Sequence, residues 1–351
     1  MKNLNETKNK NLVMDVLKKN PSSTFNPLFS YVRDVQKQIS ASAAAVYVIH
    51  NDNTAGEWYS GRHHFSSSRK VHQDSRFNIF SARKSYIGLA TAISLYEGKI
   101  NSLDDELRIY LDDAGEEIIR GVTIRHLVTH THGLELEGNR LVKEYPAGTH
   151  WGYNNAGLSL LYKIIKNTTG CTVADIIQEK VFAPLGFDET SWESEPSENL
   201  VYDILDEPEK HKISLEDRTG FERNLFVSAR ELAYWGYFHL KKGYINGTQV
   251  LPKEIFDTVT AIQTPGNMAN IPLNGFFWFR NENNYEKSEL GEKLPGGSYQ
   301  ILGKSGCTCL VIPKYNAVAV RMYNKIGNPP GYDYLRDIKN FGNLVAELFE
   351  G

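Results

Sequence analysis

Apolar residues follow two periodicities in the first hundred residues, and each predicts a different element. From Asn26 to Ile39 they recur at helical spacing, which predicts an amphipathic helix. The run Ala43–His50 is apolar and partly β-branched, which predicts a buried strand with Glu57–Gly61 as its hairpin partner. Because Ser81–Glu97 is apolar on nearly every side, we expect it to form a central, buried helix.

Helix signals dominate the segment 101–240, whereas strand signals dominate the chain after residue 270. In the middle segment a polar capping residue precedes each amphipathic run, at Thr123, Asn155, Thr172 and Ser228. The strands that we expect after residue 270 are Phe276–Arg280, Tyr299–Leu302, Thr308–Ile312 and Ala317–Tyr323. A closing helix is expected over Tyr334–Phe349.

Strands near both ends of the chain and helices in its middle predict an α+β fold. We expect a mixed, mainly antiparallel sheet, flanked by N-terminal and C-terminal helices, with an all-helical domain inserted into it. The sheet domain would comprise residues 25–100 and 241–351, and the helical domain residues 101–240. Residues 1–24, which are rich in Asn, Lys and Ser, are expected to form a loose leader.

Composition narrows the class of protein without naming a function. The chain has 351 residues, of which 41% are hydrophobic and 23% charged, as is typical of globular proteins. The net charge of -3 gives no indication of a nucleic-acid partner. The three cysteines Cys171, Cys307 and Cys309 are too few for a disulfide framework.

The N-terminus and the hydropathy of the chain bear on its location. The first twenty residues are basic and polar, without the apolar segment of a signal peptide. No run of about 20 apolar residues could form a membrane-spanning helix. We therefore expect a cytoplasmic protein without a membrane segment, or an extracytoplasmic one if the chain is truncated.

The first candidate for chemistry is Ser81-Ala82-Arg83-Lys84, at the start of the apolar helix. Positions three apart lie on one helix face, so Lys84 can sit beside the Ser81 hydroxyl and accept its proton. Loss of hydration would lower the pKa of Lys84 and make it a usable base. The alternative interpretation is a capping serine followed by an exposed lysine.

The second candidate is Tyr153-Asn154-Asn155, on a loop before a predicted helix. A tyrosine in this position can present its hydroxyl to a cleft as a proton carrier. Asn155 can form hydrogen bonds with a lysine or with a substrate amide. The alternative is that Tyr153 only packs and Asn155 only caps the helix.

The third candidate is Lys304-Ser305-Gly306, ahead of a predicted strand. Lys304 could hold a substrate carboxylate, and the backbone amide of Cys307 could donate to an oxyanion. The alternative is an ordinary polar turn. A phosphate-binding loop is disfavoured, because Ser298 stands where its first glycine belongs and a strand follows instead of a helix.

The histidines His126, His130 and His132 form a cluster without the glutamate of a His-Glu-x-x-His zinc site. We interpret them as structural, and we expect neither a metal ion nor another cofactor. The chain also lacks a Gly-x-Ser-x-Gly elbow, which disfavours an α/β-hydrolase.

Taken in order, the three motifs resemble those of the serine penicillin-recognising enzymes. The middle Tyr-x-Asn motif is similar to that of the class C β-lactamase branch, with its related DD-peptidases (carboxypeptidases) and esterases. Family-like blocks run from about Phe77 to Asn324 and include FSARKSYIGLATAISLYEGKINSLDDELRIYL, GVTIRHLVTHTHGL and YPAGTHWGYNNAGLSLLYKIIKNTTG. Two departures are His132, where the family more often has Ser, and Ser305 in place of the commoner Thr.

The resemblance implies a β-lactamase/transpeptidase-like fold and a role for each motif residue. Ser81 would be the acylated nucleophile, Lys84 its base, and Tyr153 the residue that relays protons. The substrate would be bound by Asn155, Lys304, Ser305 and Gly306. The backbone amides of Ser81 and Cys307 would form the oxyanion hole.

The function that follows is a serine hydrolase acting through a Ser81 acyl-enzyme on an amide, ester or β-lactam carbonyl. Its substrate would be a small molecule or a peptide, with a carboxylate for Lys304. Since no export signal is visible, an esterase, amidase or D-amino-acid peptidase competes with a cell-wall or antibiotic-resistance role. The alternatives are an acyltransferase using the same acyl-enzyme and a non-catalytic sensor similar to a penicillin-binding protein.

Overall fold

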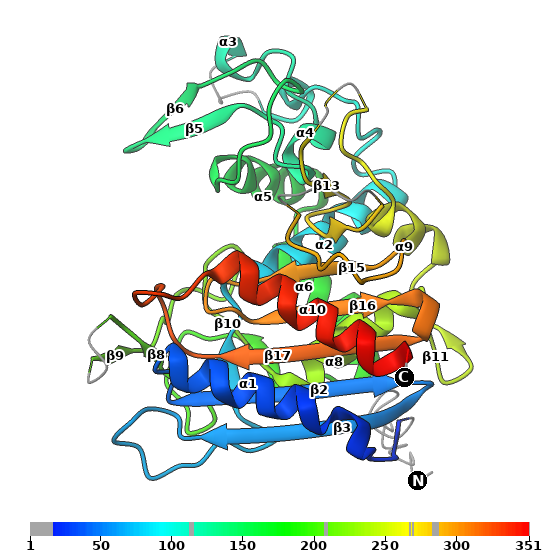
Figure 1. The fold of residues 1–351 in the computed structure, drawn as a ribbon. Helices are drawn as coiled ribbons and strands as arrows, with labels where there is room; N and C mark the ends of the chain where they lie inside the picture. Colours follow the sequence, from blue (N-terminus) through cyan, green and yellow to red (C-terminus); the bar gives the residue numbers. More distant parts are fainter. Residues whose placement is uncertain are drawn as a thin grey trace, which may run out of the picture.

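The computed structural model describes residues 17–111, 116–206, 210–266, 268, 270–282 and 288–350. Its centre is an eight-stranded sheet in the order β1-β3-β2-β17-β16-β15-β14-β13, in which every pair is antiparallel except β1 with β3 (Figure 1). The strands are β1 (Lys18–Lys19), β2 (Ala43–His50), β3 (Asn53–Gly61), β13 (Leu273–Asn274), β14 (Phe279–Arg280), β15 (Tyr299–Leu302), β16 (Thr308–Ile312) and β17 (Ala317–Tyr323).

A strand from the N-terminal part of the chain and a strand from the C-terminal part pair at the centre of this sheet. Strands β2 and β17 pair from Ala317 opposite His50 to Tyr323 opposite Ala44. Nearly all their side chains are buried because helices cover both faces, which explains the unbroken apolar runs in the sequence. Helices α1 (Asn26–Gln38) and α10 (Tyr334–Glu350) cover one face (Figure 1), as predicted from the sequence.

Helix α8 (Ala229–Leu240) covers the opposite face, against β2, β16 and β17. The sequence predicts this helix at the end of the helical domain 101–240, whereas in the structure it packs on the sheet. Gly236 permits the close approach, since a Cβ atom there would lie 2.6 Å from Sγ of Cys309. Buried Trp235 and Phe238 complete the contact.

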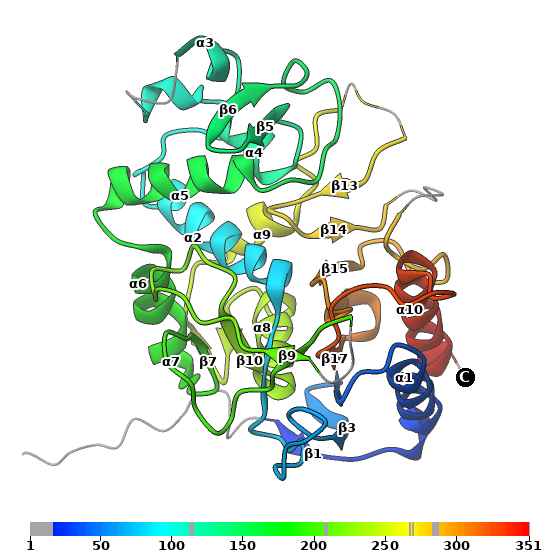
Figure 2. The same ribbon diagram turned by 90° about the vertical axis from the view of Figure 1, so that its left-hand side faces the viewer.

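Helix α2 (Lys84–Tyr96) runs through the middle of the molecule, beside α5, α6 and α9 (Figure 2). Its side chains are buried on all sides from Lys84 to Ser94, as the sequence predicted, and only its last turn reaches the surface. The remaining helices are α3 (Glu116–Ile119), α4 (Ile124–Val128), α5 (Ala156–Thr169), α6 (Val173–Ile177), α7 (Ala183–Leu185) and α9 (Lys253–Thr260).

The inserted segment is not all-helical, which corrects one detail of the predicted fold. It carries the hairpin of β5 (Leu134–Glu137) and β6 (Arg140–Lys143), turned by Gly138 at φ +62°. A three-stranded sheet joins β4 (Arg76–Asn78), β10 (Leu225–Ser228) and β7 (Thr190–Trp192). The short strands β8 (Asp203–Ile204) with β9 (His211–Lys212) and β11 (Tyr244–Ile245) with β12 (Thr248–Gln249) form two more ribbons.

Two predictions near strand ends also need correction. The leader predicted over residues 1–24 is ordered at Lys18–Lys19, which pairs with β3; residues 1–16 lie outside the described part. The strand predicted over Phe276–Arg280 is reduced to β14, because Phe277 has φ +68° and its amide donates to the carbonyl of Val128 instead of a neighbouring strand.

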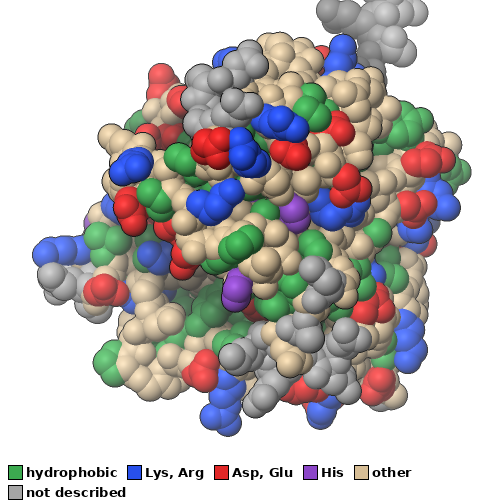
Figure 3. Space-filling view, turned by 90° about the horizontal axis from the view of Figure 1, so that it is seen from above, with side chains coloured by type: hydrophobic (Ala, Val, Ile, Leu, Met, Phe, Trp, Pro, Cys, Tyr) green, Lys and Arg blue, Asp and Glu red, His purple; other side chains and the backbone are tan. Residues whose placement is uncertain are grey.

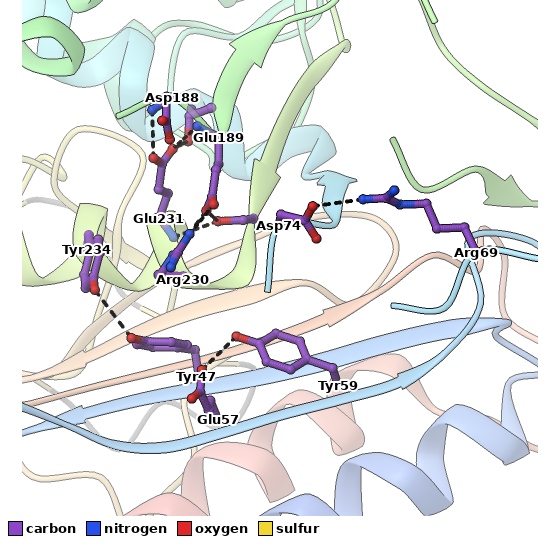
Figure 4. A network of polar contacts seen from close by, with 12 residues as sticks. Tyr47, Glu57, Tyr59, Arg69, Asp74, Asp188, Glu189, Arg230, Glu231 and Tyr234 are labelled. Carbon is purple, nitrogen blue, oxygen red and sulfur yellow. Dashed lines mark hydrogen bonds and ion pairs between the residues drawn. The ribbon is translucent and has the colours of Figure 1, made fainter. Parts of the chain in front are cut away.

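Buried polar contacts fasten α8 to β7 (Figure 4). The carboxylate of Glu231 accepts hydrogen bonds from the amides of Asp188 and Glu189 and from the hydroxyl of Thr190. Burial nevertheless raises the pKa of Glu231 to about 7. The neighbouring Arg230 pairs with Glu189. These contacts join α8, which packs on the large sheet, to the three-stranded sheet of β4, β10 and β7.

The surface is mixed in charge on the face that carries α3, β5 and β6, where acidic and basic side chains are interspersed (Figure 3). Among the described residues, no helix combines the length and the apolar character needed to cross a membrane.

Candidate active site

The chain bends sharply just before Ser81. Phe80 has φ +46°, which is uncommon for a residue with a side chain, and its amide donates to Oδ1 of Asn78 at 2.9 Å. A 3₁₀ turn over Phe80–Arg83 follows and leads directly into α2. Ser81 is thus exposed in part, directly before a helix that is buried from Lys84 to Ser94.

Lys84 lies one turn beyond Ser81 and is only 1% exposed. Its Nζ has no hydrogen-bond partner among the described residues and lies 3.6 Å from the ring centroid of Tyr153. Burial lowers its pKa well below the ordinary value, and the positive charges of Arg83 and Arg223 lower it further. The alternative of an exposed lysine is therefore wrong, and the environment favours a neutral amine.

Tyr153 stands between Lys84 and the solvent. The residue as a whole is 46% exposed. Its hydroxyl group nevertheless loses hydration in the protein, and this burial raises its pKa. A hydrogen bond with the Ser81 side chain lowers that pKa in part. The hydroxyl is therefore a neutral proton donor beside Ser81 at ordinary pH.

Asn154 and Asn155, at the start of α5, have different surroundings. Oδ1 of Asn154 accepts from the amide of Ala156 at 3.0 Å, and its Nδ2 donates to the carbonyl of Leu134. Asn155 occupies the N-cap position but its side chain makes no capping hydrogen bond. Asn154 thus supplies the structural contact, and the Asn155 side chain is left to line the cleft.

The turn Gly303–Cys307 joins β15 to β16 beside Ser81. Gly306 has φ +81°, and its amide donates to the carbonyl of Gly303 at 2.9 Å. A Cβ atom on Gly303 would lie 2.3 Å from the carbonyl oxygen of Ile79, so glycine permits contact with the segment before Ser81. Sγ of Cys307 also lies 3.3 Å from that oxygen.

A cleft of about 520 Å³ brings four of the predicted residues together: Ser81, Tyr153, Asn155 and Lys304. Lys84 lies beneath it, under the Tyr153 ring. Ser305 is 4% exposed and does not line this cleft; its Oγ has no hydrogen-bond partner among the described residues. A more open depression of about 850 Å³ near Glu57 and Arg69 contains none of the predicted residues.

Several residues of the cleft wall were not predicted from the sequence. They are Phe80, Trp151, Arg223, Phe279, Glu289, Leu302, Gly303, Gly327, Asn328 and Tyr334. Arg223 and Glu289 bring the additional charges. They come from irregular segments, where neither periodicity nor spacing marks a residue as part of a site.

The histidines of the cluster do not converge on a common point for a metal. Nδ1 of His126 accepts from the amide of Thr123, and Nδ1 of His132 accepts from the amide of Leu134. His130 is buried against the Tyr153 ring, with 4.6 Å between centroids, and burial holds its pKa well below the usual value. Within the described ranges, no three His, Cys, Asp or Glu side chains are grouped to hold a metal ion.

This fold, with the Ser-x-x-Lys, Tyr-x-Asn and Lys-Ser-Gly motifs around one cleft, defines the class of penicillin-recognising serine enzymes and their relatives. Residues 28–340 match the beta-lactamase family, and the chain belongs to it. The family suggested by the motifs is thereby confirmed.

Individual relatives cover nearly the whole chain. An uncharacterized protein of Alkalihalophilus pseudofirmus is 43% identical over 331 residues, covering 94% of this chain and 98% of that protein. A solved class C beta-lactamase matches with a TM-score of 0.76 and 13% identity, covering 92% of this chain and 96% of that one. The structure of EstCE1, a hydrolase with promiscuous acyltransferase activity, matches with a TM-score of 0.72 and 15% identity, covering 92% and 100%. These structural matches confirm the predicted fold class.

Proposed function

We propose that the protein is a serine hydrolase that forms an acyl-enzyme on Ser81 with an amide, ester or β-lactam substrate. The observation that carries the proposal is the buried Nζ of Lys84, which has no hydrogen-bond partner among the described residues and whose pKa is lowered. A dehydrated amine beside a serine hydroxyl is the arrangement that activates a weak nucleophile.

The proposed reaction has two steps. In the first, Oγ of Ser81 bonds to the carbonyl carbon and its proton passes to the neutral Nζ of Lys84. The bond to the leaving group then breaks, and that proton reaches the leaving group through the hydroxyl of Tyr153. In the second step water attacks the ester carbon, the acid is released, and one proton returns to Ser81.

The remaining motif residues bind substrate in this scheme. The amides of Ser81 and Cys307 donate to the oxyanion, and Asn155 orients the substrate amide. Lys304 is exposed on the cleft wall and holds a substrate carboxylate. Cations that hold a substrate anion are a common use of such lysines, which favours binding over pKa tuning as the role of Lys304.

Labelling with a fluorophosphonate tests the nucleophile. Intact-mass spectrometry should find a single adduct, and peptide mapping should place it on Ser81. Ser81→Ala should abolish the adduct, whereas Ser68→Ala, at an exposed loop serine, should leave it unchanged. An adduct of undiminished yield in Ser81→Ala would overturn the proposal.

An acyltransferase would use the same acyl-enzyme with a different acceptor. Because the cleft opens to solvent beside Tyr153, an amine or alcohol could replace water. The products of ester turnover with and without such an acceptor distinguish a hydrolase from an acyltransferase. A hydrolase forms free acid in both cases, whereas an acyltransferase forms acylated acceptor when the acceptor is present. An acyl-enzyme that forms and never turns over would indicate the sensor instead.

A further inference from the structure

The cleft around Ser81 carries charges of both signs. Arg223 and Lys304 contribute positive charge to its wall, and Glu289 contributes negative charge. In the part of the chain that the structure describes, no ion pair joins Glu289 to either cation. A ligand that carries both an ammonium and a carboxylate group would complement this pattern.

Glu289 is held in place by the strand that also leads to Lys304. Nε2 of Gln300, on β15, donates to the backbone carbonyl of Glu289 at 2.7 Å, and Gln300 is fully buried. The next residue, Leu290, is packed in the core between the sheet and α10. The backbone of Glu289 is thus held by Gln300 and by the buried Leu290, so its position does not depend on a ligand.

One carboxylate oxygen of Glu289 is left without a hydrogen-bond donor among the described residues. Its Oε2 is buried and has no hydrogen bond to any described residue. Burial raises its pKa to about 7, with Lys339 on α10 acting in the opposite direction. Its charge in turn raises the pKa values of Tyr153 and Tyr334, which places it within electrostatic reach of the site. A buried carboxylate oxygen without a donor is unfavourable, and a donor brought by a ligand would relieve that cost.

We propose that Glu289 binds the ammonium group of the substrate, so that the substrates are short peptides or amino-acid amides with a free amino group. The inference rests on the proposed function and deepens it. The ammonium lies on the acyl side of the scissile bond, and the carboxylate of the leaving part is held by Lys304 with Arg223. Hydroxyl or amide donors could also reach Glu289, but a charge-assisted contact is the stronger one.

The size of the cleft and the chemistry agree with this class. A volume of about 520 Å³ lies in the range of small-ligand sites and admits a dipeptide. Cleavage forms the ester bond from Ser81 to the acyl carbon and breaks the peptide C–N bond. The departing amine takes the proton relayed from Ser81, and water releases the amino acid.

Binding of dipeptides to the Ser81→Ala protein tests the inference without turnover. Isothermal titration compares alanylalanine with N-acetyl-alanylalanine, in the L,L and D,D forms. We expect the free-amine peptide of the preferred form to bind about tenfold more tightly or better. Glu289→Gln should reduce this preference to within about threefold, because the amide keeps the shape and loses the charge.

Glu292→Gln is the matched control, since Glu292 is a nearby exposed carboxylate that pairs with Lys339. It should preserve the preference for the free amine. Equal affinities of the two peptides, or a preference unchanged in Glu289→Gln, would overturn the inference. Fluorophosphonate labelling of the unmutated protein distinguishes failure of the inference from failure of the proposed function. Absence of a Ser81 adduct refutes the proposed function. An adduct on Ser81 together with no preference for the free amine refutes only the inference.

Discussion

Lys84 illustrates how much one residue depends on its surroundings. Its amine lies in a dehydrated space beneath the Tyr153 ring, and two arginines add positive charge nearby. Both effects favour the neutral form, which is the form that can accept a proton. The base form is therefore lost as pH falls through the lowered pKa of Lys84, and it is complete above that pKa.

We expect the rate of Ser81 labelling to rise with pH on the acid side as Lys84 loses its proton. In Arg223→Gln this rise should move to higher pH, because one charge that lowers the pKa of Lys84 is gone. Lys84→Ala should slow labelling by about 10²–10⁴, the usual effect of removing a positioned base. The measurement is the second-order labelling rate against pH.

Arg336→Gln removes an exposed arginine of α10 and serves as the charge-matched control, with an unchanged pH profile expected. If Arg223→Gln also left the profile unchanged, or if Lys84→Ala labelled within a few-fold of the unmutated protein, the base would have to be sought elsewhere.

At the scale of elements, one turn between β15 and β16 carries both Lys304 and the proposed oxyanion donor, the amide of Cys307. Strand pairing sets Leu302 opposite Thr308, and the amide of Gly303 donates to the carbonyl of Cys307 at 2.9 Å. These bonds hold the Cys307 amide within the turn, while Lys304 extends from its exposed side. The two proposed roles thus belong to one hydrogen-bonded turn.

Lys304→Ala should therefore affect binding selectively. We expect it to raise KM for an ester that carries a carboxylate near the scissile bond and to spare a matched neutral ester. The measurement is kcat and KM for both esters in the two proteins. If the variant lost kcat/KM equally for both, carboxylate binding would not be the main role of Lys304.

At the scale of the whole molecule, one buried ion pair joins both terminal helices to the site. Arg321 on β17 donates to both carboxylate oxygens of Asp337 on α10, and its Nε donates to the carbonyl of Gly306 at 3.1 Å. Tyr31 on α1 and Tyr332 also donate to Asp337. Burial by itself raises the pKa of Asp337, but Arg321 holds it below its usual value.

Arg321→Met should both destabilise the protein and slow acylation. It leaves Asp337 buried without its cation, which costs about 3–5 kcal/mol of unfolding free energy, and it removes the donor that fixes Gly306. The double variant Arg321→Met/Asp337→Leu should recover most of the stability, because the unpaired charge is gone, but not the acylation rate. Thermal unfolding and fluorophosphonate labelling measure the two effects.

Arg336→Met, on the exposed side of α10, should change neither property. Recovery of the full acylation rate in the double variant would mean that Arg321 acts through stability alone and does not position the Gly306–Cys307 turn.

Sequence alone determined the main elements and the three motifs. Apolar periodicity is local, so α1, α10, β2, β15, β16 and β17 were predicted close to their observed bounds. Strand β3 is longer than predicted and begins at Asn53. The order of Ser81, Tyr153 and Lys304 along the chain was sufficient to indicate the family. The turn before β14 and the short strand Lys18–Lys19 were missed, since contacts distant in sequence decide them.

Tertiary structure decided which charges meet in the cleft and how each residue is solvated. Arg223 and Glu289 lie far from Ser81 in sequence and join it only because separate loops close around one space. The burial of Lys84 depends on the Tyr153 ring, and the turn at Phe80 depends on Asn78. Hydration and electrostatic potential arise from atoms that surround a group in three dimensions, so neither can be obtained from its neighbours along the chain.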